Sequence, residues 1–172
     1  YVLEDILGRF GVEVTFVDGT DLAQWQAAIR DDTKVVFFES ISNPTLEVID
    51  LRYVCDAAHK VGALVLVDDA MATPVFSYAK ECGADIAIVS TTKHVDGQGR
   101  MLGGIICGDK ALIRGPIEAY MKHTGGAMNP FAAWTHLKAL ETMELRVRAQ
   151  ATAALHVADA LAGHPKLSAV RY

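Results

Sequence analysis

The chain has 172 residues, enough for a single domain with a sizeable core. Hydrophobic residues make up 51% of it and charged residues 22%, a composition that is too apolar for a disordered segment. The 16 Lys and Arg against 21 Asp and Glu give a net charge of −5, which argues against nucleic acid or an anionic membrane surface as the main partner.

No segment of the sequence is typical of a membrane or secreted protein. The longest apolar run, residues 62–67, is far shorter than the roughly 20 residues that span a bilayer. The first residues carry acid where a secretory signal carries a basic flank. Three cysteines, Cys55, Cys82 and Cys107, lie apart in apolar stretches, which predicts buried thiols and no disulfide framework. We therefore expect a cytoplasmic protein.

The first half of the sequence alternates between strand and helix patterns. The chain opens inside a helical pattern that ends at Gly8, without an initiator methionine, so we expect a piece of a longer polypeptide. A short strand is predicted at residues 12–17, followed by a helix that Asp21 caps. Residues 34–38 form a continuous β-branched and aromatic run, typical of a strand buried on both faces, and Asp50 then caps a second helix.

The alternation continues through the middle of the chain. Residues 63–67 predict a third strand, residues 74–82 a third helix with Pro at its start, and residues 86–89 a fourth strand. Strands that alternate with helices of this length indicate an α/β fold, with a parallel sheet covered by helices on both faces.

The pattern changes after residue 90. The linker before the next predicted strand, at residues 103–107, is too polar and glycine-rich for a crossover helix, so we expect that strand to be antiparallel. Residues 109–122 predict a helix. Asn129 and Pro130 then open a helical pattern of about 30 residues, well above the usual globular length of roughly 10 to 14.

A helix of this length is typical of one that bridges two substructures. We therefore divide the chain into a central part of a large domain at 1–128, a bridging helix at 129–164 and the start of a further domain at 165–172. Within the last part, residues 167–172 predict a strand.

Three polar clusters follow the predicted parallel strands, at residues 39–44, 68–69 and 90–94. In an open parallel sheet, ligands bind outside the carboxyl ends of the strands, so these clusters should meet at one edge. Asp68 follows the apolar run Leu-Val-Leu-Val and needs a cation or a strong donor as its partner. Lys93, just after a buried strand, is placed where its amine can act as a nucleophile.

Each of these residues also has an ordinary structural role to weigh. An Asp after a strand is usually a turn or a helix cap, a Lys in a polar loop is usually solvated, and Ser90 and Thr92 are possible turn hydroxyls. The glycines at 97, 99 and 103 precede a strand and do not open a helix, which excludes a dinucleotide fingerprint. The six histidines show no metal-site spacing, and His136 and His156 are expected on faces of the long helix.

Taken together, an acid, a lysine and hydroxyls at one edge are the groups that a pyridoxal phosphate site needs. Five motifs then stand in a specific order: residues 39–44 (Glu-Ser-Ile-Ser-Asn-Pro), 65–69 (Val-Leu-Val-Asp-Asp), 90–94 (Ser-Thr-Thr-Lys-His), 126–134 (Gly-Ala-Met-Asn-Pro-Phe-Ala-Ala-Trp) and 140–146 (Leu-Glu-Thr-Met-Glu-Leu-Arg). In this order the sequence closely resembles the Cys/Met metabolism family of pyridoxal-phosphate enzymes, over essentially its whole length.

The resemblance implies a fold-type-I large domain and a role for each candidate residue. Lys93 would hold pyridoxal 5'-phosphate through its amine, and Asp68 would keep the pyridinium nitrogen protonated. Ser90 and Thr92 would bind the phosphate, and Asn43 would lie near the ring hydroxyl. It also implies an amino-acid substrate and a homotetramer built as a dimer of dimers, with the active site completed across a dimer interface.

Two departures from the family pattern bear on the reaction. Asp69-Ala70 stands where many relatives have Asn-Thr, and residues 94–100 replace a Tyr-x-Asn-Gly-His-Ser-Asp loop. The loop of this chain at residues 94–100 resembles the loop of the family branch that replaces the γ-substituent of O-succinylhomoserine with sulfide. A cystathionine γ-synthase and a cystathionine or methionine γ-lyase remain alternatives, as does a non-catalytic assembly module.

Relative to the family, the sequence lacks an upstream segment with a glycine turn and a stacking tyrosine, and a downstream domain whose arginine takes the substrate carboxylate. The 172 residues alone are therefore expected to be inactive.

Overall fold

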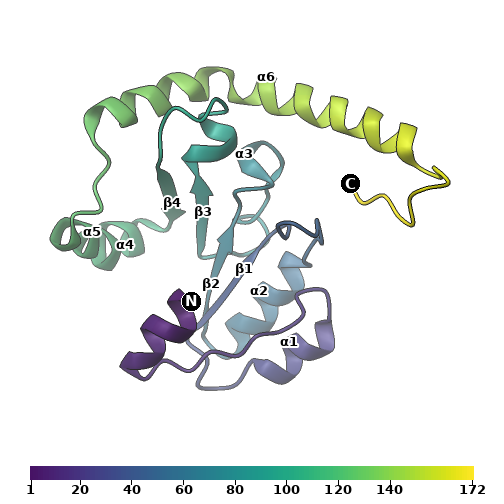
Figure 1. Cartoon of the computed structure of the whole chain (residues 1–172). Helices are drawn as coiled ribbons and strands as arrows, with labels where there is room; N and C mark the ends of the chain where they lie inside the picture. Colours follow the sequence, from purple (N-terminus) through teal and green to yellow (C-terminus); the bar gives the residue numbers. More distant parts are fainter.

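The computed structural model describes residues 1–172, and its centre is a four-stranded sheet in the order β1-β2-β3-β4 (Figure 1). Strands β1 (Val35–Glu39), β2 (Leu64–Asp68) and β3 (Ile86–Ser90) are parallel. Strand β4 (Gly104–Gly108) pairs with β3 in antiparallel orientation. The α/β class, the mostly parallel sheet and the antiparallel fourth partner are therefore confirmed.

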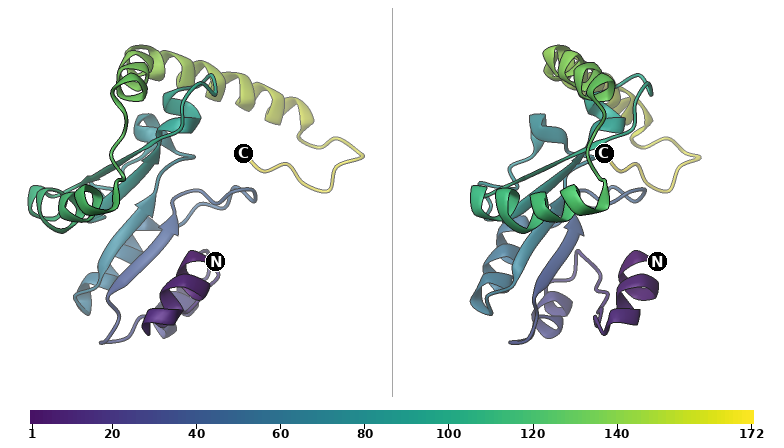
Figure 2. Two further views of the ribbon diagram at one scale, coloured as in Figure 1. Left: turned by 60° about the vertical axis from the view of Figure 1, so that its left-hand side comes forward. Right: turned by 90° about the vertical axis from the view of Figure 1, so that its left-hand side faces the viewer.

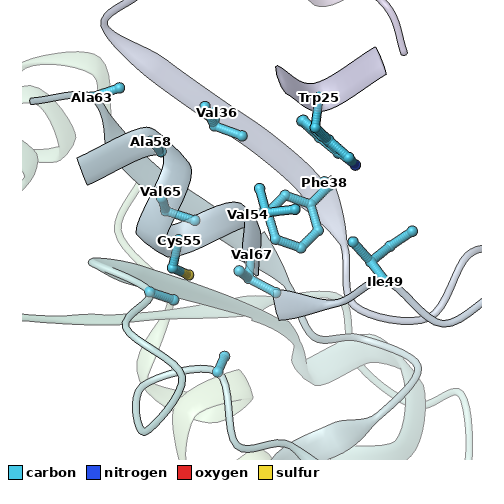
Figure 3. Close-up of a cluster of buried hydrophobic side chains, with 12 residues drawn as sticks. Trp25, Val36, Phe38, Ile49, Val54, Cys55, Ala58, Ala63, Val65 and Val67 are labelled. Atoms are coloured by element: carbon cyan, nitrogen blue, oxygen red, sulfur yellow. The ribbon is translucent and has the colours of Figure 1, made fainter. Parts of the chain in front are cut away.

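Two capped helices pack beside the parallel strands. Asp21 accepts hydrogen bonds from two backbone N–H groups at the start of α1 (Leu22–Ala28), and Asp50 accepts one at the start of α2 (Leu51–Lys60). The core joins α2 to the sheet (Figure 3), and its members are Trp25, Val36, Phe38, Ile49, Val54, Cys55, Ala58, Ala63, Val65, Val67, Ala79 and Ala84. This core fixes the strands whose carboxyl ends carry the candidate site.

The second face of β1 is uncovered, which corrects the prediction of a strand buried on both faces. Val36 and Phe38 are buried, whereas the alternate residues Val35 and Phe37 are 50% and 44% exposed. Successive side chains of a strand point to opposite faces, and α2 lies on only one of them (Figure 2). The apolar character of the run therefore did not reveal which face is covered.

A single long helix, α6 (Pro130–Leu161), confirms the predicted 30-residue pattern with 32 residues. The side chain of Asn129 accepts a hydrogen bond from the backbone N–H of Ala132 at 2.9 Å, as expected of a cap. Figure 1 shows α6 crossing the carboxyl ends of the strands. It contacts the segment that follows β3, so the helix lies directly over the candidate site.

Other predicted elements are shorter than expected or absent. The first residues form helical turns at Val2–Ile6 and Leu7–Phe10, which end at Gly11 and not at Gly8. Residues 12–17 and 167–172 form no strand, because neither segment pairs with another strand.

Two predicted helices are interrupted by identifiable residues. Helix α3 covers only Thr73–Phe76, because Ser77 is extended (φ −80°, ψ 141°) and its hydroxyl bonds to Asp69. The segment 109–122 is broken at Gly115 (φ −98°, ψ −107°), with helical residues at Lys110–Leu112 (α4), at Ile113–Ile117 and at Glu118–Thr124 (α5). Pro116 supplies no N–H, which fits a break at this point.

The three cysteines differ in exposure, which corrects the prediction of three buried thiols. Cys55 is buried, Cys82 is half-buried and Cys107 is exposed on β4, and all three are free thiols. Burial, together with the nearby Cys82 and Asp85, raises the pKa of the Cys55 thiol to about 11. Cys55 is therefore a packing residue of the core. None of the helices, α6 included, combines the length and the apolar character that a membrane span requires.

The apolar stripe on α6 predicts that the 172-residue chain, expressed alone, self-associates. Phe131, Trp134, Leu137 and Leu145 are 62%, 57%, 61% and 73% exposed, and the first two stack on each other. At about 25 cal/mol per Å², burying a few hundred Å² of such surface corresponds to several kcal/mol. Light scattering should show oligomers that shift toward monomer in the double variant Trp134→Gln/Leu137→Gln. A monodisperse wild-type monomer would contradict the prediction.

Candidate active site

The carboxyl ends of β1, β2 and β3 bring the three polar clusters to one edge of the sheet. Glu39 pairs with Asp68 in the register of β1 and β2, and Asp68 pairs with Ile88 in the register of β2 and β3. Ser90, the last residue of β3, lies two positions beyond Ile88. The parallel pairing therefore places the residues that follow β1, β2 and β3 at the same edge of the sheet, which we call the rim.

The backbone around Asp68 is held by both neighbouring strands. Its carbonyl accepts a hydrogen bond from the N–H of Ser40 at 3.0 Å, and the N–H of Asp69 donates to the carbonyl of Ile88 at 2.8 Å. The carboxylate of Asp68 is half-buried, and its Oδ1 accepts from the N–H of Ala70 at 2.9 Å. One carboxylate oxygen is thus fixed by the chain, while no protein donor bonds to the other.

The adjacent Asp69 has a different environment. It is 2% exposed, and its Oδ2 accepts a hydrogen bond from the hydroxyl of Ser77. Its backbone carbonyl also accepts from the N–H of Thr73 at the start of α3. Asp69 therefore ties α3 and the following turn to the sheet, and it is the less accessible of the two carboxylates.

The hydroxyls near the end of β3 divide into a free one and two engaged ones. Ser90 is half-buried, and its hydroxyl makes no hydrogen bond within the chain. The Thr92 hydroxyl accepts from the N–H of Gly103 at 3.0 Å and donates to the carbonyl of Gly103 at 3.3 Å. Thr91 is fully buried, and its hydroxyl lies 3.2 Å from Nε2 of His136. If the Thr92 hydroxyl donates its proton to a ligand, it gives up the 3.3 Å hydrogen bond to the carbonyl of Gly103.

Lys93 projects from the loop that follows β3. The chain leaves helical geometry at this residue (φ −89°, ψ −115°), inside the turn Thr91–Val95. Its side chain is exposed, and its amine forms no ion pair. The backbone carbonyl of Lys93 accepts from the N–H of Gly97 at 2.7 Å, which closes the loop. The amine is therefore accessible on a backbone that is itself constrained.

Asn43 lies at the β1 side of the rim. Its side chain is exposed, and its backbone N–H donates to Oε2 of Glu39 at 2.7 Å. That bond fixes the turn after β1, so Glu39 has a structural role that the sequence did not identify.

Three further residues hold the Lys93 loop and were not assigned to the site from the sequence: Asp96, His136 and Arg146. Asp96 is fully buried, and it accepts hydrogen bonds from the backbone N–H of Arg100 at 2.7 Å and from its Nε at 2.9 Å. His136 and Arg146 come from α6, about 50 positions along the chain. Contacts of such long range have no signal in local spacing.

The carboxylate of Asp96 anchors the loop in its charged form. Burial favours the neutral acid, but the backbone N–H and the guanidinium of Arg100 outweigh it and hold the pKa of Asp96 below its usual value. A depressed folded-state pKa means that this stabilisation is complete above the unfolded-state pKa of about 3.9. It is lost as the pH falls through the lower folded-state pKa.

We predict that Asp96→Asn lowers the free energy of unfolding at pH 7 by about 1–3 kcal/mol, the usual effect of weakening a hydrogen bond to a charged group. The difference from wild type should shrink below about pH 4, because the carboxylate of the unfolded state is protonated there first and that of the folded state only at lower pH. Denaturant unfolding of the full-length protein across this pH range measures both. Asp109→Asn, which removes an exposed partner of Lys80, is the control and should change little. An unchanged difference at all pH values would contradict the linkage.

The donor set at the rim fits pyridoxal phosphate. An accessible lysine amine, a carboxylate with one oxygen free of protein donors and an unengaged serine hydroxyl are complementary to the aldehyde, the ring nitrogen and the phosphate of that cofactor. An α/β sheet with these groups beyond its parallel strands is the arrangement of a pyridoxal-phosphate enzyme.

The chain belongs to the Cys/Met metabolism family of PLP-dependent enzymes, whose sequence model matches residues 1–172. This confirms the family that the motifs predict, and pyridoxal phosphate as the cofactor.

Individual relatives carry several reactions. The chain is 46% identical to an O-succinylhomoserine sulfhydrylase of Mycobacterium tuberculosis over 99% of its length, and it spans 42% of that protein. It is 37% identical to the chloroplastic cystathionine gamma-synthase 1 of Arabidopsis thaliana over 99% of its length, which is 30% of that protein. The fold matches cystathionine gamma-lyase from Lactobacillus plantarum, solved in complex with L-serine, with a TM-score of 0.92 and 26% identity, over 98% of this chain and 44% of that one.

Proposed function

We propose that the chain is part of a cytoplasmic enzyme of methionine biosynthesis that replaces the γ-substituent of an O-acylated homoserine with sulfide. With O-succinylhomoserine, the C–O bond at the γ-carbon breaks, succinate leaves, and sulfide forms the C–S bond of homocysteine. The observation that carries the proposal is the 46% identity to a sulfhydrylase over nearly the whole chain, against 37% to a cystathionine γ-synthase. The resemblance of the loop at residues 94–100 to the sulfhydrylase branch supports the same reaction.

The residues at the rim would divide the work between binding and proton transfer. When bound, pyridoxal phosphate supplies an electron sink that makes protons near the substrate amino group acidic. Lys93 would hold the cofactor and then, once its amine is released, move protons at the substrate carbons. Asp68 would keep a proton on the ring nitrogen, and Ser90 and Thr92 would donate to the phosphate. Asn43 would lie beside the ring hydroxyl.

Product analysis of the full-length protein tests the reaction. O-succinylhomoserine would be incubated with sulfide, with cysteine and with no added nucleophile, and O-acetylhomoserine would replace it in a parallel series. Cystathionine and methionine would each be incubated without an added nucleophile. The proposal expects homocysteine and succinate with sulfide as the fastest reaction.

Each other outcome assigns a different member of the family. Cystathionine as the main product with cysteine would assign the γ-synthase, in line with the Arabidopsis relative. Breakdown of cystathionine or methionine without an added nucleophile would assign a γ-lyase, in line with the Lactobacillus structure. A protein that binds no cofactor and turns over none of these substrates would indicate a non-catalytic module.

A further inference from the structure

The guanidinium of Arg146 on α6 forms hydrogen bonds to the loop that carries Lys93. Its Nη1 donates to the carbonyl of His94 at 3.0 Å, and its Nη2 donates to the carbonyl of Val95 at 2.8 Å. These are the two residues that follow Lys93. A planar fork that reaches two successive carbonyls fixes the direction of the backbone as well as its distance from the helix.

The other N–H groups of Arg146 fasten the side chain to its own helix. Nη2 also donates to the carbonyl of Ala139 at 3.0 Å, and Nε donates to the hydroxyl of Thr142 at 3.1 Å. The guanidinium is thereby held in place before it reaches the loop. Its hydrogen bonds therefore connect α6 to the two residues that follow Lys93.

Arg146 differs in this respect from the charged residues around it. It forms no ion pair, although it is half-buried, whereas Arg148 on the same helix pairs with Glu144 at 2.9 Å and is largely exposed. The guanidinium of Arg146 therefore donates its hydrogen bonds to backbone carbonyls and a hydroxyl, and not to a carboxylate. The substitution Arg146→Lys would keep the charge but would lose the two parallel N–H donors that reach successive carbonyls.

Gly97 shows how closely the guanidinium packs on the loop. A Cβ atom at residue 97 would overlap Nη1 of Arg146, and the positive φ of 69° at this residue is one that side chains rarely adopt. The backbone of the loop thus lies directly against the guanidinium, with no side chain between them at residue 97. A glycine at this residue therefore allows the close approach between the loop and the guanidinium.

We propose that Arg146 is a positioning residue that sets the direction of the Lys93 side chain through the carbonyls of His94 and Val95. The inference rests on the proposed role of Lys93. Because Arg146 acts through the backbone, its loss should leave the cofactor bound while the amine reaches the reacting atoms less often. A misplacement of about 1 Å costs on the order of 100-fold in rate, which sets the scale of the effect.

The test uses the full-length holoenzyme with Arg146→Lys, and with Arg148→Lys as the matched control on the same helix. We expect Arg146→Lys to lower kcat by about 10- to 100-fold with KM nearly unchanged. Cofactor content should stay near one per chain, and the pH titration of the lysine-bound absorbance should shift. The control should match wild type in every measurement, because lysine keeps the positive charge beside Glu144 and near the ring of Phe76, and exposed contacts of these kinds contribute little.

Hydrogen exchange of the cofactor-free protein gives a readout that does not depend on turnover. Amides at residues 93–97 should exchange about tenfold faster in Arg146→Lys, while β2 and β3 keep wild-type protection. Equal acceleration across the sheet with a lowered Tm would indicate a purely structural role and would overturn the proposal, as would unchanged loop exchange and kcat.

A milder variant keeps the proposal testable if Arg146→Lys does not fold. Thr142→Val removes the partner of Nε and leaves the guanidinium in place, so it should shift loop exchange and kcat in the same direction by a smaller factor. Wild-type behaviour of this variant would then overturn the proposal. Lys93→Ala separates the two assignments: if it keeps the bound-cofactor absorbance, the role of Lys93 itself fails, whatever Arg146 does.

Discussion

Lys93→Ala in the full-length protein is expected to remove the visible absorbance of the lysine-bound cofactor and to lower turnover by at least about 10²- to 10⁴-fold, the usual contribution of a proton-transferring side chain. The structure leaves no substitute at the rim. Lys34 precedes β1, at the opposite edge of the sheet, and Lys80 is paired with Asp109 at 2.7 Å. Without the amine at residue 93, the polar clusters that follow β1, β2 and β3 contain no other lysine.

Absorbance spectra and sulfide-dependent turnover measure the two effects together. Lys80→Ala is a suitable control, because it removes an exposed lysine and should leave both unchanged. A Lys93→Ala protein with normal absorbance and activity would show that the cofactor is held elsewhere.

The elements that the sequence predicted well are those with strong local signals. The run Leu-Val-Leu-Val before Asp68 has no polar residue that would shift its register, and it forms β2 as expected. Asp21, Asp50 and Asn129 each accept hydrogen bonds at the start of a helix, because a short polar side chain satisfies N–H groups that the helix cannot.

The elements that were wrong depend on contacts distant in the sequence. Residues 12–17 have the composition of a strand, but a strand needs a neighbour for its hydrogen bonds, and the chain places none beside them. The segment 74–82 has a helical pattern, but the bond from Ser77 to Asp69 holds the chain extended at residue 77. The division at residues 128 and 164 stays a prediction, although α6 itself lies where it was expected.

The candidate site shows the same limit. The order of parallel strands predicts that Asp68, Ser90 and Lys93 lie at one edge. The register sets Asp68 of β2 beside Ile88 of β3, and Ser90 and Lys93 follow Ile88 along the chain. Arg146 and His136 read as ordinary positions of a helix, because their partners lie about 50 and 45 residues away. The candidate binding residues are thus visible in the sequence, whereas the residues that hold the loop require the fold.

The two neighbouring carboxylates at the end of β2 give the second large prediction. Asp68→Asn is expected to leave the cofactor bound and to slow turnover by about 10²-fold or more, because a neutral amide does not hold the proton on the ring nitrogen. Folding should be little affected, since the side-chain oxygen of Asn still accepts from the N–H of Ala70. Spectra, kcat and Tm of the variant measure the three effects separately.

Asp69→Asn is the matched comparison, one residue along the same chain. Asp69 is 2% exposed and accepts from Ser77, a bond that the amide oxygen of Asn also accepts. Its substitution should therefore change turnover much less than Asp68→Asn. If Asp69→Asn proved the more damaging of the two, the carboxylate that faces the cofactor would be the buried one. The side of the sheet on which the ring lies would then be the face that α2 covers, because successive residues at a strand end point to opposite faces.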